Sequence, residues 1–128
     1  MTIKRYFATA DNTITNAFKE NLVTRGTGSN MGLADILEVF SIYGQATSAS
    51  AEASRVLIQF DTNQVSTDRT AGVIPASGSV SFYLNMFNTP HAETLPVDFT
   101  LTVSAVSQSW QEGYGLDMET YSDLTFGG

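Results

Sequence analysis

The sequence predicts an all-β fold, a two-layer antiparallel β-sandwich that is jelly-roll-like, on three observations. First, residues 54–61, 79–87 and 97–105 alternate apolar and polar side chains with the period of a half-buried strand. Second, stretches rich in Gly, Pro and Asn separate these segments. Third, only 15% of the residues are charged, which is typical of polar strand faces rather than of helical surfaces. Because each strand has one apolar face, a second layer has to cover it.

The composition predicts one domain over residues 1–128, and it excludes several classes of function. The chain has no cysteine, so it offers neither a thiol nucleophile nor a zinc–thiolate site. Its net charge of −7 argues against nucleic acid and anionic membrane as partners. No apolar run is long enough for membrane insertion, and no export signal is recognisable. The ending at Gly127-Gly128 leaves open that the chain is the N-terminal part of a longer one.

The first third of the chain predicts short strands and loops. Residues 5–18 predict two short strands with a turn at Asp11-Asn12, and residues 19–32 predict a loop. Residues 31–44 have helical spacing but are rich in β-branched and aromatic side chains, which favours a strand over the alternative of a helix. Residues 45–53 are small and polar and predict an exposed connection.

The remaining chain predicts the main strands of the sandwich. Residues 54–61 are expected to form its central strand, and residues 61–78 a long crossing loop with at most one short turn of helix. Strands are then expected at 79–87 and 97–105, and a short edge strand at 122–126. The residues expected to point inward are Val56, Ile58 and Phe60, then Val80, Phe82, Leu84 and Met86, and finally Val97, Phe99, Leu101, Val103 and Ala105.

The residues that carry chemistry indicate a non-enzymatic protein. His91 is the only histidine and lies beside Pro90 in a predicted loop, and no spacing selects a pair of carboxylates across a cleft. Asp61, Asn63 and Asp68 form the best candidate for a hard-cation site, with calcium as the ion. The alternative for Asp61 and Asn63 is ordinary Asx-turn capping. No cofactor is predicted.

The aromatic residues predict a contact surface. Tyr83, Tyr114 and Tyr121 are the candidates for that surface, where aromatic rings stack on sugar rings or on a protein partner. Trp110 has the opposite parity to Phe99, which indicates a bulge, and we expect its side chain in the core.

Five stretches of the chain, taken together, resemble a known family. They are Ala10-Asp11-Asn12-Thr13-Ile14, Asn30-x-Gly32, Ser54-Arg55-Val56-Leu57-Ile58-Gln59-Phe60-Asp61, Val80-x-Phe82-Tyr83-Leu84 and Val103-x-x-Val106-x-x-x-Trp110-x-Glu112-Gly113. They resemble the DNRLRE-type β-sandwich modules of large surface and secreted proteins, whose relatives bind carbohydrate. The whole chain is also similar to uncharacterised virion structural proteins of marine tailed phages. In the family a Trp-bearing strand follows the Trp-x-Glu-Gly element, whereas only Tyr114, Tyr121 and Phe126 follow it here.

These resemblances imply two functions. The first is a structural or attachment module of a tailed-phage virion, in a head decoration, a fibre or a tail appendage, that contacts other virion proteins or copies of itself. The alternative is an extracellular carbohydrate-binding β-sandwich module of a larger secreted or surface protein, with glycans as its ligands. The ligand, the host, the oligomeric state and the position in the virion do not follow from the sequence.

Overall fold

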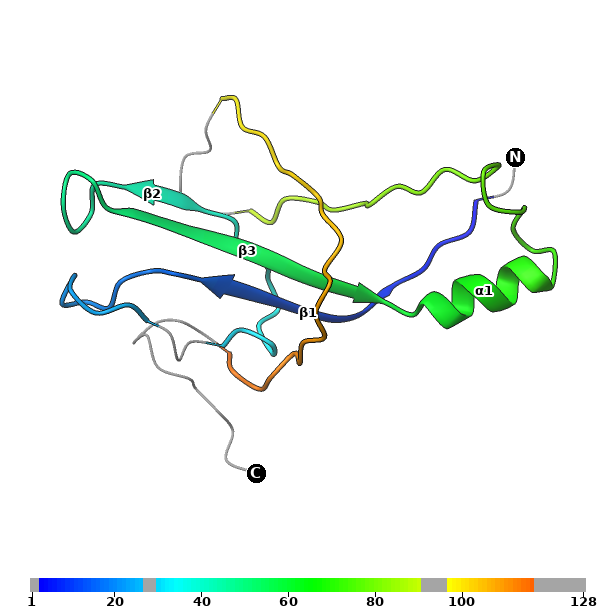
Figure 1. Cartoon of the computed structure of the whole chain (residues 1–128), viewed down its shortest axis with the longest axis horizontal. Helices are drawn as coiled ribbons and strands as arrows, with labels where there is room; N and C mark the ends of the chain where they lie inside the picture. Colours follow the sequence, from blue (N-terminus) through cyan, green and yellow to red (C-terminus); the bar gives the residue numbers. More distant parts are fainter. Residues whose placement is uncertain (1–2, 27–29, 91–96, 117–128) are drawn as a thin grey trace.

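A computed structural model describes residues 3–26, 30–90 and 97–116 of the chain. Its regular elements are β1 (Ala8–Thr15), β2 (Ser41–Tyr43), β3 (Ala51–Phe60) and α1 (Thr62–Thr70). The three strands form one open antiparallel sheet in the order β1-β3-β2, and α1 continues from the end of β3 (Figure 1). The fold is therefore mostly β, as predicted, but the described residues form neither the second layer of a sandwich nor a jelly roll.

β3 is the central strand of the sheet, which confirms the prediction for residues 54–61. It pairs with β1 on one side over most of its length and with β2 on the other side at residues 51–53 only. The strand begins at Ala51, so the prediction of an exposed connection over residues 45–53 was wrong for its last three residues. Alanine and glutamate are weak strand formers, and the pairing with β2 overrides their propensity here.

β1 is one strand of eight residues, so the prediction of two short strands with a turn at Asp11-Asn12 was wrong. The register with β3 shifts only between Ala8 and Ala10. Aspartate and asparagine favour turns because their side chains bond to the local backbone. Here the Asn12 side chain bonds to distant backbone groups instead, and the strand continues.

Residues 31–44 form neither a helix nor a long strand. The predicted strand is confirmed only as β2, at residues 41–43. The preceding residues make one backbone bond to β3, from the Ser54 amide to the Phe40 carbonyl, and side chains take the place of further ladder bonds: Thr13 Oγ1 accepts from the Glu38 amide at 3.0 Å, and Ser54 Oγ accepts from the Phe40 amide at 2.8 Å. These bonds occupy the backbone groups that a continued strand would use.

The segment after β3 contains a nine-residue helix, α1, where a loop with at most one helical turn was expected. Its N-cap is Asp61, whose carboxylate accepts from the Asn63 amide at 2.9 Å. Arg69 lies in the last turn, where a cation interacts favourably with the helix dipole. No residue of α1 is buried, so the apolar periodicity that identifies most helices is absent from this one.

The structure forms no strand at residues 79–87 or 97–105, so the prediction of strands there was wrong. Both segments are extended but neither is in a sheet, and within the described ranges no hydrogen bond joins residues 80–87 or 97–107 to a strand. The side chains expected to point inward are accordingly exposed, with Phe82 at 64% and Phe99 at 63%. In Figure 1 one segment runs beside the sheet and the other crosses it. A segment with alternating side chains forms a strand only when another strand pairs with it. Neither of these two segments pairs with a strand here.

The interior of the described chain is small and as polar as it is apolar. Its buried apolar residues are Ala17, Met31 and Ile74, and its buried polar residues are Asn12, Thr13 and Glu52. On β3, Val56 and Ile58 are only half-buried and Phe60 is exposed, so the expected apolar face of this strand is covered in part. Side-chain hydrogen bonds to backbone groups therefore carry much of the tertiary structure.

The far end of β1 is fastened to the start of β3. The Arg25 guanidinium donates to the Asn16 and Ala51 carbonyls and lies 3.6 Å from the centre of the Phe18 ring. The Phe18 amide donates to the buried carboxylate of Glu52 at 2.7 Å. This end of the sheet is thereby closed without a large apolar cluster.

The N-terminal segment is fastened to α1 by two polar contacts to one carboxylate, that of Asp68. The Tyr6 hydroxyl donates to the Asp68 carboxylate at 2.9 Å, and Lys4 Nζ lies 3.1 Å from the same oxygen. These two partners lower the pKa of Asp68, the hydroxyl first. Burial, followed by the bond to Asp68, raises the pKa of Tyr6 above its ordinary value. The predicted edge strand at residues 122–126 lies outside the described residues.

These pKa shifts predict that the N-terminal segment detaches from α1 at both ends of the pH scale. A depressed carboxyl pKa stabilises the folded state above the ordinary value for Asp, and that stabilisation is lost as the pH falls through the lowered pKa. A raised phenol pKa stabilises below the ordinary value of about 10, and this contribution is lost as the pH rises through the raised pKa. NMR shifts of the Lys4 and Tyr6 amides should report both steps.

The matched variant is Tyr6→Phe, which leaves the Lys4–Asp68 ion pair in place. It should keep the acid step and lose the part of the alkaline step that the phenol contributes. If both amide signals are flat from acid to alkaline pH, the contact does not form in solution.

Candidate functional site

Three distant parts of the chain meet in a polar junction made by Asn12, Asn30 and Glu112. Asn12 Nδ2 donates to the Glu112 carbonyl at 2.6 Å, and Asn12 Oδ1 accepts from the Met31 amide at 3.2 Å. Asn30 Oδ1 accepts from the amides of residues 32 and 115, and its Nδ2 donates to the same Glu112 carbonyl. The Glu112 carboxylate in turn accepts from the Asp11 amide on the outer edge of β1, at 2.8 Å. The junction thus fixes the segment after Trp110 against β1.

Three glycines allow the junction to close. A Cβ atom added at Gly32 would overlap the Glu112 carbonyl, one at Gly113 would overlap the Asn30 side chain, and one at Gly115 would overlap the Asn30 backbone. Gly113 also has a φ of 80°, which L-residues with a side chain rarely adopt. The backbones approach so closely that only hydrogen fits at these positions.

The carboxyl groups of Asp11 and Glu112 both lie at the junction, and their surroundings disfavour the ionised form of Asp11. Burial raises the pKa of the Asp11 carboxyl, and repulsion by Glu112 raises it further. The ionised form of Asp11 is therefore less favourable in the folded chain than in the unfolded chain, so stability falls as the pH rises through this raised pKa. The polar side chains of the junction bond to backbone groups of the same chain, so we interpret the junction as a structural contact rather than as a binding site.

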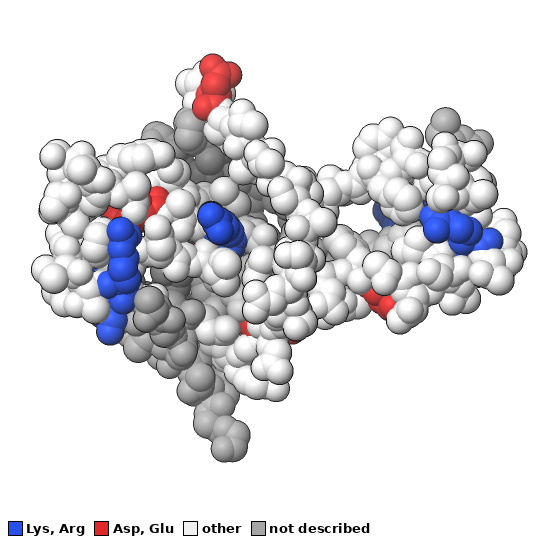
Figure 2. Space-filling view, viewed as in Figure 1, with Lys and Arg blue, Asp and Glu red and all other residues white. Residues whose placement is uncertain are grey.

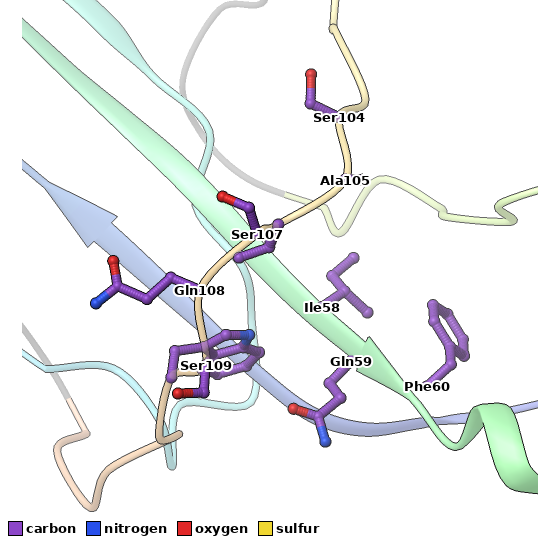
Figure 3. A pocket seen from close by; sticks show the side chains of 10 residues that line it. Ile58, Gln59, Phe60, Ser104, Ala105, Ser107, Gln108 and Ser109 are labelled. Carbon is purple, nitrogen blue, oxygen red and sulfur yellow. The ribbon is translucent and has the colours of Figure 1, made fainter.

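A pocket of about 460 Å³ lies where the crossing segment passes the end of β3. Its floor is Ile58, Gln59 and Phe60, and its other wall is residues 104–110. Figure 3 shows Ser107, Gln108 and Ser109 on the crossing segment beside these β3 residues. Its lining combines apolar side chains and the rings of Phe60 and Trp110 with hydroxyls and amides, and it holds no charged residue. Such a lining suits an uncharged ligand that has both an apolar face and hydroxyl groups.

Two of the three predicted contact aromatics lie in the described ranges, and both are exposed and away from the pocket. Tyr83 is 87% exposed and Tyr114 is 71% exposed, and neither lines the pocket. Tyr121 lies outside the described residues, as does His91. Trp110, expected in the core, is only half-buried and lines the pocket instead.

The candidate calcium ligands are placed in two different contacts. Asp61 and Asn63 form the N-cap of α1, which is the alternative that the sequence left open for them. Asp68 pairs with Tyr6 and Lys4 on the N-terminal segment. Over the described ranges no three acidic or histidine side chains cluster as a metal site requires.

Sequence reasoning missed the pocket and the role of the junction. The signal for the pocket was the uncharged, serine-rich run over residues 104–109 directly before Trp110. The junction residues were noted for their types, but long-range bonds of this kind leave no periodicity in the sequence. Their spacing, from residue 12 to residue 112, cannot be read from any local window.

Comparison with protein-family models, with curated proteins and with solved structures found no significant match to this chain. The resemblance to DNRLRE-type modules and to phage virion proteins therefore stays a prediction. Within residues 3–26, 30–90 and 97–116, no helix has the length and hydropathy needed to cross a bilayer.

The junction predicts that Gly32→Ala destabilises the chain through steric overlap alone. The added methyl meets the Glu112 backbone, so a backbone segment has to move, at a cost of about 1–3 kcal/mol in the free energy of unfolding. Urea denaturation followed by circular dichroism measures this change.

Gly44→Ala is the matched control. Gly44 has a φ of 74° but no atom within 4 Å of an added Cβ, so the variant only strains the left-handed backbone, at a cost of about 1 kcal/mol and with no steric overlap. Equal losses for the two variants would show that the junction does not hold these backbones in contact.

Proposed function

We propose that this chain is a non-enzymatic structural or attachment module of a tailed-phage virion that acts through protein–protein contacts. One observation carries the proposal: two extended segments, residues 79–90 and 97–107, present large apolar side chains to solvent. Large apolar side chains exposed in number along one segment are typical of an interaction site. The resemblance to virion structural proteins supplies the setting.

The charge distribution supports contacts with protein. Residues 79–90 contain no charged side chain and residues 97–107 contain only Asp98. On the face in Figure 2, the ridge that these crossing residues form is accordingly almost entirely uncharged. Depletion of charge is the compositional mark of the buried centre of a protein interface.

The two-layer, jelly-roll-like sandwich belongs to this proposal. Residues 79–87 and 97–105, whose alternation is that of half-buried strands, would supply the strands that it lacks. In the assembled particle these segments gain the neighbours that they lack in the isolated chain. Assembly and completion of the fold would then be one event.

Light scattering over a range of concentrations tests the contact surface. We expect the average mass to rise above the 13.8 kDa of one chain. Phe99→Glu should weaken the association about tenfold or more, because it places an unpaired charge in an apolar interface. Thr100→Glu, on the opposite parity of the same segment, is the matched control and should change it little.

The virion setting has its own test. Mass spectrometry of purified particles, from a phage that encodes this chain, should find its peptides in stoichiometric amount. Their absence from complete particles would contradict the structural role, whatever the light scattering shows.

The pocket beside β3 favours the second candidate function, an extracellular carbohydrate-binding module. Its uncharged lining offers the Trp110 and Phe60 rings for stacking, and the Gln59 and Gln108 amides for hydrogen bonds to hydroxyls. On a glycan array, Trp110→Ala should abolish binding, whereas Tyr114→Ala, outside the pocket, should not. Binding that survives Trp110→Ala would remove the pocket as its site.

A further inference from the structure

The chain exposes far more surface than a monomer of its size. Its accessible surface is 10372 Å², whereas a folded monomer of 13.8 kDa is expected to expose about 6,600 Å². The excess of about 3,700 Å² per chain amounts to about 7,400 Å² for two chains, which is more than the roughly 2,000–5,000 Å² that permanent oligomers bury in total. The exposed apolar residues of segments 79–90 and 97–107 contribute to it.

The sheet has an open edge at its centre. Residues of β3 direct their backbone groups alternately toward β1 and toward β2. The Ser54 amide donates to the Phe40 carbonyl on the β2 side, so Val56 and Ile58 direct their N–H and C=O groups to that side as well. β2 pairs only with residues 51–53, and no described bond reaches Val56 or Ile58 from that side. The central strand is thus unpaired along half of its length.

The chain also carries a strand without a sheet. Residues 79–87 are extended, alternate apolar and polar side chains, and make no hydrogen bond with a strand. The segment has nine residues, which is longer than the open edge from Val56 to Phe60. Because the segment has no charged side chain, its addition to the edge of β3 carries no free-energy cost for desolvating an ion.

We propose that residues 79–87 of a second copy of this chain add to the open edge of β3 at Val56 and Ile58. The exchange is reciprocal, so that each copy donates one strand and receives one. It deepens the proposed function, on which it rests, by naming the partner and the way it binds.

Two observations select a second copy over other occupants. The chain holds both complementary parts, an edge that lacks a strand and a strand that lacks an edge, so two copies satisfy each other through a closed two-fold interface. The excess surface of two chains is also larger than the total area that a permanent dimer has to bury. Exposed strand edges are a ready template for such pairing.

Hydrogen exchange against protein concentration tests the exchange of strands. In the dimer the Val56 and Ile58 amides are bonded, so they should exchange about tenfold or more slowly than in the free chain, and this protection should fall on dilution. The Arg55 and Leu57 amides face β1 and should stay protected at every concentration. Sedimentation velocity on the same samples should show a dimer.

Leu84→Pro is the variant that targets the donated strand, because proline removes a ladder N–H from its middle. It should be monomeric, with Val56 and Ile58 unprotected and Arg55 and Leu57 still protected. The control is Ser77→Pro. Residue 77 occupies the second position of a turn in which the Ser79 amide donates to the Ala76 carbonyl and Gly78 has a φ of 95°, a turn that accepts proline there. This variant should remain a dimer.

Three results would overturn the proposal. A dimer with unprotected Val56 and Ile58 amides would associate through another surface. Protection that is independent of concentration would mean that the chain's own segment closes the edge. A chain that sediments as a monomer at every concentration would show that no strand is exchanged between copies.

The particle composition described above is unaffected by these results, so the proposed function and the strand exchange can fail separately. If Leu84→Pro loses protection at Arg55 and Leu57, it has unfolded, and the dilution series on the unaltered chain decides.

Discussion

The fold depends on one constraint, the convergence of Asn12, Asn30 and Glu112 on shared backbone partners. Few apolar residues are buried among those that the structure describes, so these polar bonds take over the role that a core has in most domains. They connect residues about a hundred positions apart, and they do so with amide and carbonyl geometry that tolerates little displacement. Gly32, Gly113 and Gly115 are part of the same constraint, because the bonded backbones leave no room for a side chain. The crossing segment, and the pocket that it forms with β3, are held in place by this junction.

Local patterns predicted what local physics controls. β3 combines β-branched residues, alternation and a clear turn signal after it, and the sequence located it as the central strand. The open alternative for Asp61, an Asx cap, became the start of α1, although the helix itself was missed because it has no apolar stripe. β1 was split in two by turn-forming residues whose side chains bond to partners far away in the chain. Tertiary bonds override propensity at such positions, and no sequence window contains them.

The largest difference between expectation and structure concerns residues 79–87 and 97–105. Their alternation is the strongest in the chain, yet neither segment is in a sheet. Periodicity predicts which face of a strand prefers burial, but it does not predict which segment of the protein packs against that face. The same ambiguity limited the site: Trp110 was assigned to a core that the described chain does not build, and it lines an open pocket instead. The candidate site followed from the sequence only as a set of aromatic residue types, since their grouping depends on how the crossing segment is fastened.

α1 has a practical consequence for work with this protein. It buries none of its residues, it begins at a self-contained cap, and beyond the Asp68 contact nothing described in the sheet or the junction rests on it. A fluorophore, an epitope or a peptide cargo grafted onto its solvent-facing turns would therefore leave the β-strands undisturbed. This makes the helix a suitable site for attaching foreign groups to the chain.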